Sequence, residues 1–162
     1  MREICSVSEC LSAGAENWIQ HWRHNGLGWF NSVTDALAVI PAADRGGYRL
    51  FAYRLHPDVF TRAGRRAAAL PGNVGPEPLP AGFVSRGFDS ASKSSDAGLG
   101  LECSPLSCNG LAAEMAVNEH CLFPTLEAAI AGAVRFAAEQ PEPGDYYVVE
   151  VLEDVGARIA PS

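Results

Sequence analysis

The stretch Asp145-Tyr-Tyr-Val-Val-Glu-Val-Leu152 is nearly continuous in apolar residues, and most of them favour β-strands. A strand with apolar side chains in both alternating sets is covered on both faces. We therefore predict that this segment is a central strand of a sheet. Tyr48-Arg-Leu-Phe-Ala-Tyr-Arg-Leu55 has the same pattern and predicts a second central strand, whose continuation Pro57 limits.

Four segments carry the signals of a helix, which are an N-cap residue followed by apolar residues at spacings of three and four. The four cap residues are Ser8, Ser32, Asn109 and Thr125. Long loops are expected at 56–82, where four prolines fall within ten residues, and at 89–100, which is rich in Ser and Gly. Together these features predict an α+β fold. It would have one mixed or antiparallel sheet around strands 48–55 and 146–152, with three to four helices packed mainly on one face.

The chain has 162 residues and 48% hydrophobic content, which fits a single globular domain over 1–162. No apolar stretch is long enough to span a bilayer, and Arg2, Glu3 and Glu9 interrupt the region where a signal peptide would be apolar. We expect a cytoplasmic protein without membrane contact. Arginine is the dominant cation, with a single lysine at Lys93, and this bias is typical of a GC-rich bacterial genome.

Two parts of the chain resemble each other. Residues 25–37 align without gaps on residues 118–130, and Cys5-Ser-x3-Cys10 matches Cys103-Ser-x3-Cys108. One explanation is an internal β-α-β duplication with related halves at 5–56 and 103–153. The other is convergence of two segments on the same capped, Ala-rich helix for packing reasons.

The charge is unevenly distributed. The formal net charge of −7 disfavours binding to a phosphate backbone, so nucleic acid is an improbable partner. Residues 44–66 carry six arginines and two aspartates, whereas residues 114–162 carry nine acids and two arginines. Either the two regions neutralise each other in the fold, or the acidic half forms a surface that meets a basic protein partner.

The densest group of reactive residues is Glu102-Cys-Ser-Pro-Leu-Ser-Cys-Asn-Gly110. A thiol directly before a helix is stabilised as a thiolate, which makes Cys108 a candidate nucleophile. His120 is the candidate general base, and Asn118 or Glu102 would orient its imidazole. The candidate binding residues around this catalytic group are Asp89, Ser90, Glu102, Cys103 and Asn109.

Other interpretations of the same residues stay open. Five cysteines without an export signal indicate reduced thiols, which can simply be small buried side chains. Zinc binding is an alternative, with ligands from Cys103, Cys108, one of His120 and Cys121, and also Cys5 and Cys10. The loose Cys-x4-Cys spacing disfavours it, and we expect no metal and no cofactor.

The sequence contains no Gly-x-Ser-x-Gly, P-loop, dinucleotide-binding or His-Glu-x-x-His motif. The absence of these catalytic motifs favours a partner-binding or regulatory protein, such as an immunity, antitoxin or accessory factor. The alternative function is a small thiol-dependent enzyme of the acyl-transfer or hydrolase type.

Overall fold

The structure is a computed structural model of the chain and describes residues 30, 32–43, 48–68, 78, 81–93, 101, 103–108 and 113–156. Within α3 the side chains of residues 107 and 108 are outside this description. The elements in chain order are α2 (Val33–Ala38), β1 (Phe51–Thr61), β2 (Gly64–Ala67), β3 (Phe83–Lys93), α3 (Pro105–Cys108), α4 (Leu126–Glu139) and β4 (Asp145–Asp154).

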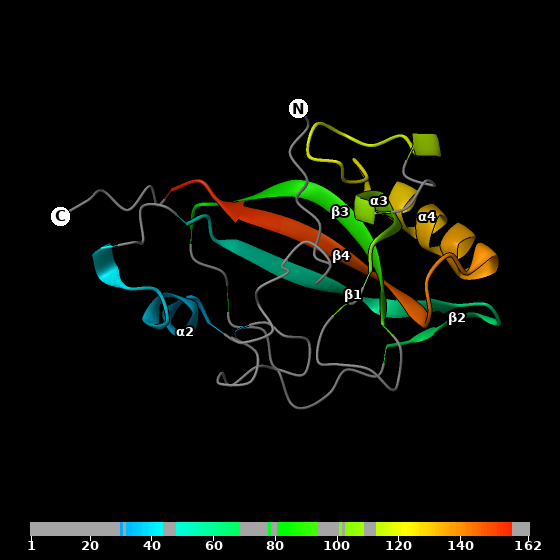
Figure 1. Ribbon diagram of the computed structural model, residues 1–162, viewed down its shortest axis with the longest axis horizontal. Coiled ribbons are helices and arrows are strands. Elements are labelled where there is room, and N and C mark those ends of the chain that lie inside the picture. Colours follow the sequence, from blue (N-terminus) through cyan, green and yellow to red (C-terminus); the bar gives the residue numbers. More distant parts are fainter. Residues whose placement is uncertain are drawn as a thin grey trace.

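The strands form one antiparallel sheet in the order β2-β1-β4-β3 (Figure 1). β4 lies between β1 and β3, and β1 lies between β2 and β4. The two segments predicted as central strands are therefore the two inner strands, and the α+β class is confirmed. None of the described helices has the length and apolar character needed to cross a bilayer.

β4 is buried on both faces. Tyr146 and Val148 pack with the inner side of α4, whereas Tyr147, Val149 and Val151 belong to a second apolar cluster on the opposite face of the sheet. All five side chains are at most 7% exposed. The continuous apolar pattern of the sequence thus corresponds to a strand covered from both sides.

α4 packs against one face of the sheet and begins where the sequence predicts (Figure 1). The Thr125 hydroxyl accepts a hydrogen bond from the Ala128 N–H, and Gln140 ends the helix in the left-handed region at φ 48°. The buried residues of α4 are Ala129, Gly132, Ala133, Phe136 and Ala137. Small residues bring the helix close to the sheet, and the Phe136 ring lies 5.7 Å from the Tyr146 ring.

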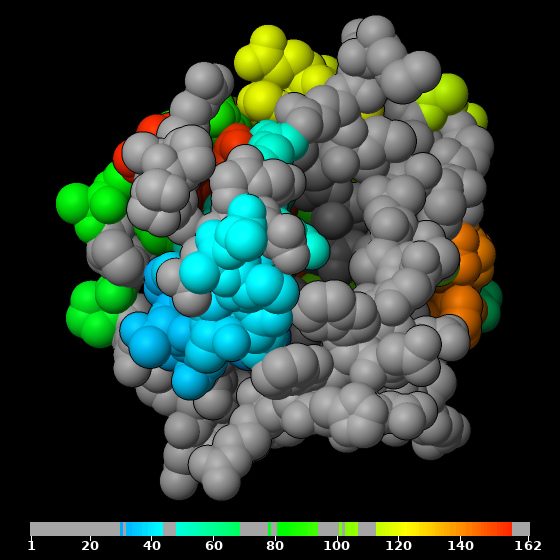
Figure 2. Space-filling model, turned by 60° about the vertical axis from the view of Figure 1, so that its left-hand side comes forward, coloured from blue at the N-terminus to red at the C-terminus, as the bar shows by residue number. Residues whose placement is uncertain are grey.

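Ser32 caps α2, as predicted, by accepting a hydrogen bond from the Asp35 N–H. In Figure 2, α2 (blue to cyan) lies on the side of the molecule that faces the viewer, and α4 (orange) lies at the right-hand edge. The helix predicted after Ser8 is outside the described residues, as are residues 5–10 and 25–29 of the proposed duplication. The number of helices and the duplication therefore remain predictions.

Both predicted loops are partly wrong, because strands extend into them. β1 continues to Thr61 and turns into β2, and the register shift between Leu55 and Val59 accommodates Pro57 at an irregular position where it does not interrupt the ladder. β3 continues to Lys93, and Asp89 and Ser90 are completely buried within it. Polar composition suggested exposure there, but these side chains find hydrogen-bond partners inside the protein.

Arginines of the basic segment pair with acids of the acidic half. Arg54 contacts Glu150 at 2.8 Å, and Arg66 contacts Asp145 at 2.5 Å. Glu153 binds two arginines, with the Arg49 Nε 2.7 Å from Oε1 and the Arg86 Nε 2.7 Å from Oε2. These pairs favour the explanation in which the two charged regions neutralise each other across the sheet.

Replacing Glu153 by Gln should reveal the stabilising effect of the two arginines. The hydrogen bond from Arg49, assisted by that from Arg86, holds the pKa of Glu153 below its ordinary value of 4.5 despite burial. The ion pairs therefore stabilise the fold at and above pH 4.5, and this contribution is lost as the pH falls through the lowered pKa. At neutral pH we expect Glu153→Gln to cost about 1–2 kcal/mol of unfolding free energy, because Arg49 is partly exposed.

The measurement is urea denaturation of both proteins between neutral pH and about pH 3, with the difference shrinking toward the acid end. Glu150→Gln on the same strand is the matched control. Its partner Arg54 is 65% exposed, so the expected loss is at most about 1 kcal/mol. An equal effect of the two substitutions at neutral pH would contradict this account.

Candidate functional site

Most of the predicted site residues lie along the outer edge of β3. The Ser92 N–H donates to the Cys103 carbonyl at 2.7 Å, and Phe88 and Phe123 exchange backbone hydrogen bonds of 2.9 and 2.8 Å. Two later segments of the chain, 103–108 and 118–123, therefore cover the edge of this end strand. Glu102 and Asn109 are outside the described residues.

Asp89, Ser90 and the Cys-Ser turn come together in the interior. The Asp89 Oδ1 accepts a hydrogen bond of 2.5 Å from the Ser104 hydroxyl and one of 2.8 Å from the Ser90 N–H. The Ser104 Oγ in turn accepts from the Leu106 N–H at 3.2 Å, which caps the start of α3. The Ser90 hydroxyl donates to the Ala129 carbonyl of α4 at 3.0 Å. This buried network fixes α3 and α4 to β3.

Cys108 is the last residue of α3, so its position relative to this helix is not the one that the thiolate hypothesis assumed. The residue directly before α3 is Ser104, and its side chain caps this helix. The helix predicted from Asn109 to Met115 falls largely outside the described residues, and its described part is a single 3₁₀ turn at 113–114.

Asn118 organises a tight turn rather than the imidazole of His120. Its Oδ1 accepts hydrogen bonds from the backbone N–H groups of His120 at 2.9 Å and Leu122 at 3.1 Å. Its Nδ2 donates to the Arg86 carbonyl at 2.7 Å, which ties the turn to β3. Gly87, at φ +129°, makes room for it, because a Cβ there would lie 2.8 Å from Nδ2 and 2.7 Å from the Phe123 carbonyl oxygen.

The His120 side chain is 16% exposed, and its Nε2 lies 3.5 Å from Glu119. Its Nδ1 is buried and has no hydrogen-bond partner among the residues described. Cys103 lies opposite Ser92, whereas the turn that carries His120 lies opposite Gly87 and Phe88, about 13 Å further along the strand. Cys103 and the turn that carries His120 therefore contact different parts of β3.

Neither the half-buried Cys103 nor Cys121 forms a disulfide. Within the described part of the chain, no group of three or more His, Cys, Asp or Glu side chains is arranged to hold a metal ion. The zinc hypothesis receives no geometric support from these residues.

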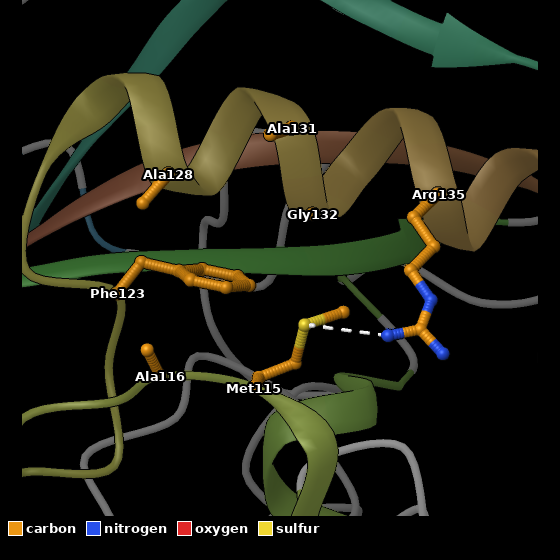
Figure 3. Close-up of a pocket in the computed structure, with 7 residues that line it drawn as sticks. All are labelled: Met115, Ala116, Phe123, Ala128, Ala131, Gly132 and Arg135. Atoms are coloured by element: carbon orange, nitrogen blue, oxygen red, sulfur yellow. Dashed lines mark hydrogen bonds between the residues drawn. The ribbon is translucent and has the colours of Figure 1, made fainter.

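A cleft that the sequence did not predict lies between α4 and the segment before Asn118 (Figure 3). It has a volume of about 290 Å³, and its lining residues are Met115, Ala116, Phe123, Ala128, Ala131, Gly132 and Arg135. The Phe123 ring forms the floor and rests against Gly132, where a Cβ would come within 2.4 Å of the ring. Gly132 therefore allows the ring to lie against the helix.

Arg135 stands at one end of the cleft and is held by two carboxylates. Its Nη2 lies 2.5 Å from Glu114, its Nε lies 2.7 Å from Glu139, and its Nη1 contacts the Met115 sulfur at 3.9 Å. The hydrogen bonds that Arg135 donates to Glu114 and Glu139 raise the pKa of its guanidinium above the ordinary value. The cleft thus combines apolar walls with a cation that is already neutralised.

One sequence signal could have located this cleft. A helix that packs on a sheet through one face usually carries polar residues on the other, yet α4 exposes Ala131 and Val134. Neither the outward apolar residues nor the glycine inside the helix fits a helix with only one packed side.

The role of Asn118 can be tested by replacement with Ala, which removes three side-chain hydrogen bonds. We expect a loss of about 2–3 kcal/mol of unfolding free energy and faster amide hydrogen exchange at His120 and Leu122. In Asn118→Asp the acceptor oxygen remains, so these two amides should stay protected. Unchanged exchange in the Ala variant would show that the turn does not depend on this side chain.

Comparisons with protein-family models, curated proteins and solved structures found no match to this chain.

Proposed function

We propose that this chain is a partner-binding protein with a regulatory, immunity-like or accessory role, and that the cleft beside α4 is its binding surface. The observation that carries the proposal is the apolar, solvent-open hollow formed by Met115, Phe123 and the small residues of α4. Water in contact with such a surface is released when an apolar group of another molecule fills it.

The ion pairs of the sheet limit the surfaces to which a basic partner could bind. Asp145, Glu150 and Glu153 are already engaged by arginines of the same chain, so they offer little free charge. The acids around the cleft are different, since Glu114 and Glu139 share the guanidinium of Arg135 and Glu127 forms no ion pair within the described residues. We therefore propose that a basic partner binds at α4. The bias toward arginine supports a bacterial setting for this interaction.

Site-specific photo-crosslinking in cells tests the proposal. A photoreactive residue at Ala116, at the exposed margin of the cleft, should capture a defined partner. Adding Ala131→Arg, which fills the cleft from an exposed helix position, should abolish the capture. Ala138→Arg makes the same chemical change two turns along α4 and outside the cleft, so it should leave the capture intact.

Loss of the crosslink in both arginine variants would point to a general charge effect and count against the cleft. Capture that persists in Ala131→Arg would remove the cleft from the interaction. Raising the salt concentration should weaken the interaction, because charged groups at the rim are screened.

A thiol-dependent enzyme is the second candidate, and one observation favours it. The His120 Nδ1 has no partner in the described part of the protein, which leaves a nitrogen available for proton transfer. In this proposal Cys108 is the nucleophile and His120 the base, and the substrate is an acyl or similar electrophilic group.

Alkylation by iodoacetamide distinguishes an activated Cys108 from an inert thiol. An activated Cys108 should react well below pH 8.5, the approximate pKa of a free thiol, and His120→Gln should remove the additional titration from its rate profile. Cys108→Ser identifies the modified residue by mass spectrometry. A rate that rises only as an ordinary thiol ionises would eliminate this candidate.

A further inference from the structure

We infer that the group bound in the α4 cleft is an apolar side chain on a basic amphipathic helix of a partner protein. This inference rests on the proposed function and specifies the chemistry of the partner. It follows from three properties of the cleft, which are its size, the residues at its margin, and the charge around it.

The size and lining of the cleft fit one large apolar side chain. The volume of about 290 Å³ is at the lower end of what small-molecule sites have. The Phe123 ring forms the floor of the cleft, and the Met115 thioether forms the wall that lies opposite α4 (Figure 3). A flexible thioether beside an aromatic ring adapts to a Leu, Met or Phe side chain without a fixed hydrogen-bonding pattern. An anchor residue is therefore a better match than a polar metabolite.

The helix side of the cleft permits close approach of another backbone. Ala128, Ala131 and Gly132 project almost no side chain from this part of α4, as Figure 3 shows. An amphipathic helix can present one apolar anchor to a groove while its backbone lies against such small residues. An extended segment would instead need free backbone groups at the edge of a sheet, and α4 offers none because its own turns use them.

The charge around the cleft selects a basic partner. The guanidinium of Arg135 already binds Glu114 and Glu139, so a carboxylate ligand would have to displace one of them. Glu127 lies one turn before Ala131, is exposed, and forms no ion pair within the described residues. Three carboxylates against one guanidinium repel acidic peptides, fatty acids and anionic membranes, and they attract Lys and Arg.

A display library of random peptides of about 16 residues, long enough to form an amphipathic helix, tests this inference on the full chain. Binding to the wild-type protein is selected, and binding to the Ala131→Arg variant is selected against. We expect enriched peptides with a large apolar residue, further apolar residues at helical spacing, and an excess of Lys and Arg. Fluorescence anisotropy then gives the affinity of one labelled peptide for each variant.

Ala131→Arg should lower the affinity for that peptide at least about tenfold, whereas Ala138→Arg should change the affinity less than about twofold. Glu127→Gln should weaken it about threefold at low salt, with the difference vanishing at high salt. Replacing the Lys and Arg residues of the peptide by Glu should abolish binding.

Enrichment of acidic peptides, or of none that distinguishes the wild type from Ala131→Arg, would overturn the inference. So would a dimer of this chain that Ala131→Arg dissociates in analytical ultracentrifugation, because the occupant would then be a second copy. The proposed function fails separately, when crosslinking from Ala116 captures no cleft-dependent partner. A captured partner whose contact segment is acidic or extended would uphold the function and refute the basic helix.

Discussion

The packing of β4 between two strands and two apolar layers is the constraint on which the described structure depends. Its backbone pairs with β1 on one side and β3 on the other, while Tyr146 and Val149 point into opposite clusters. Antiparallel pairing then places Arg54 of β1 beside Glu150 of β4. Three acids of β4, Asp145, Glu150 and Glu153, are in this way joined by ion pairs to arginines of the basic segment.

The sequence predicted the features that depend on neighbouring residues. The two inner strands follow from local apolar patterns, and the caps at Ser32 and Thr125 follow from side chains that bind an N–H three residues away. It failed where the partner is distant. Asp89 and Ser90 looked like loop residues, but they are buried because they bind Ser104 and Ala129, which lie 15 and 39 residues further along the chain.

The candidate site shows the same division. Sequence reasoning identified Asn118 as a residue that holds others in place, but it assigned the imidazole of His120 instead of the backbone as its target. The cleft was not predicted, for a related reason. It arises where Phe123 meets Gly132 across a turn and a helix, and no spacing rule connects an aromatic residue before a helix with a glycine inside it.

The two end strands of the sheet differ in how they can meet another protein. Backbone partners occupy the outer side of β3 at Phe88 and Ser92, and the Asp89 carboxylate takes the N–H of Ser90, so another strand has little to pair with. β2 is short and fully exposed, and it carries Arg65 and Arg66. Arg65 pairs with Asp58 and Arg66 with Asp145, so this edge carries little free charge to repel a second copy. Occupied hydrogen bonds thus close the sheet to a further strand at the β3 end, whereas at the β2 end a strand of four residues offers few backbone groups for pairing.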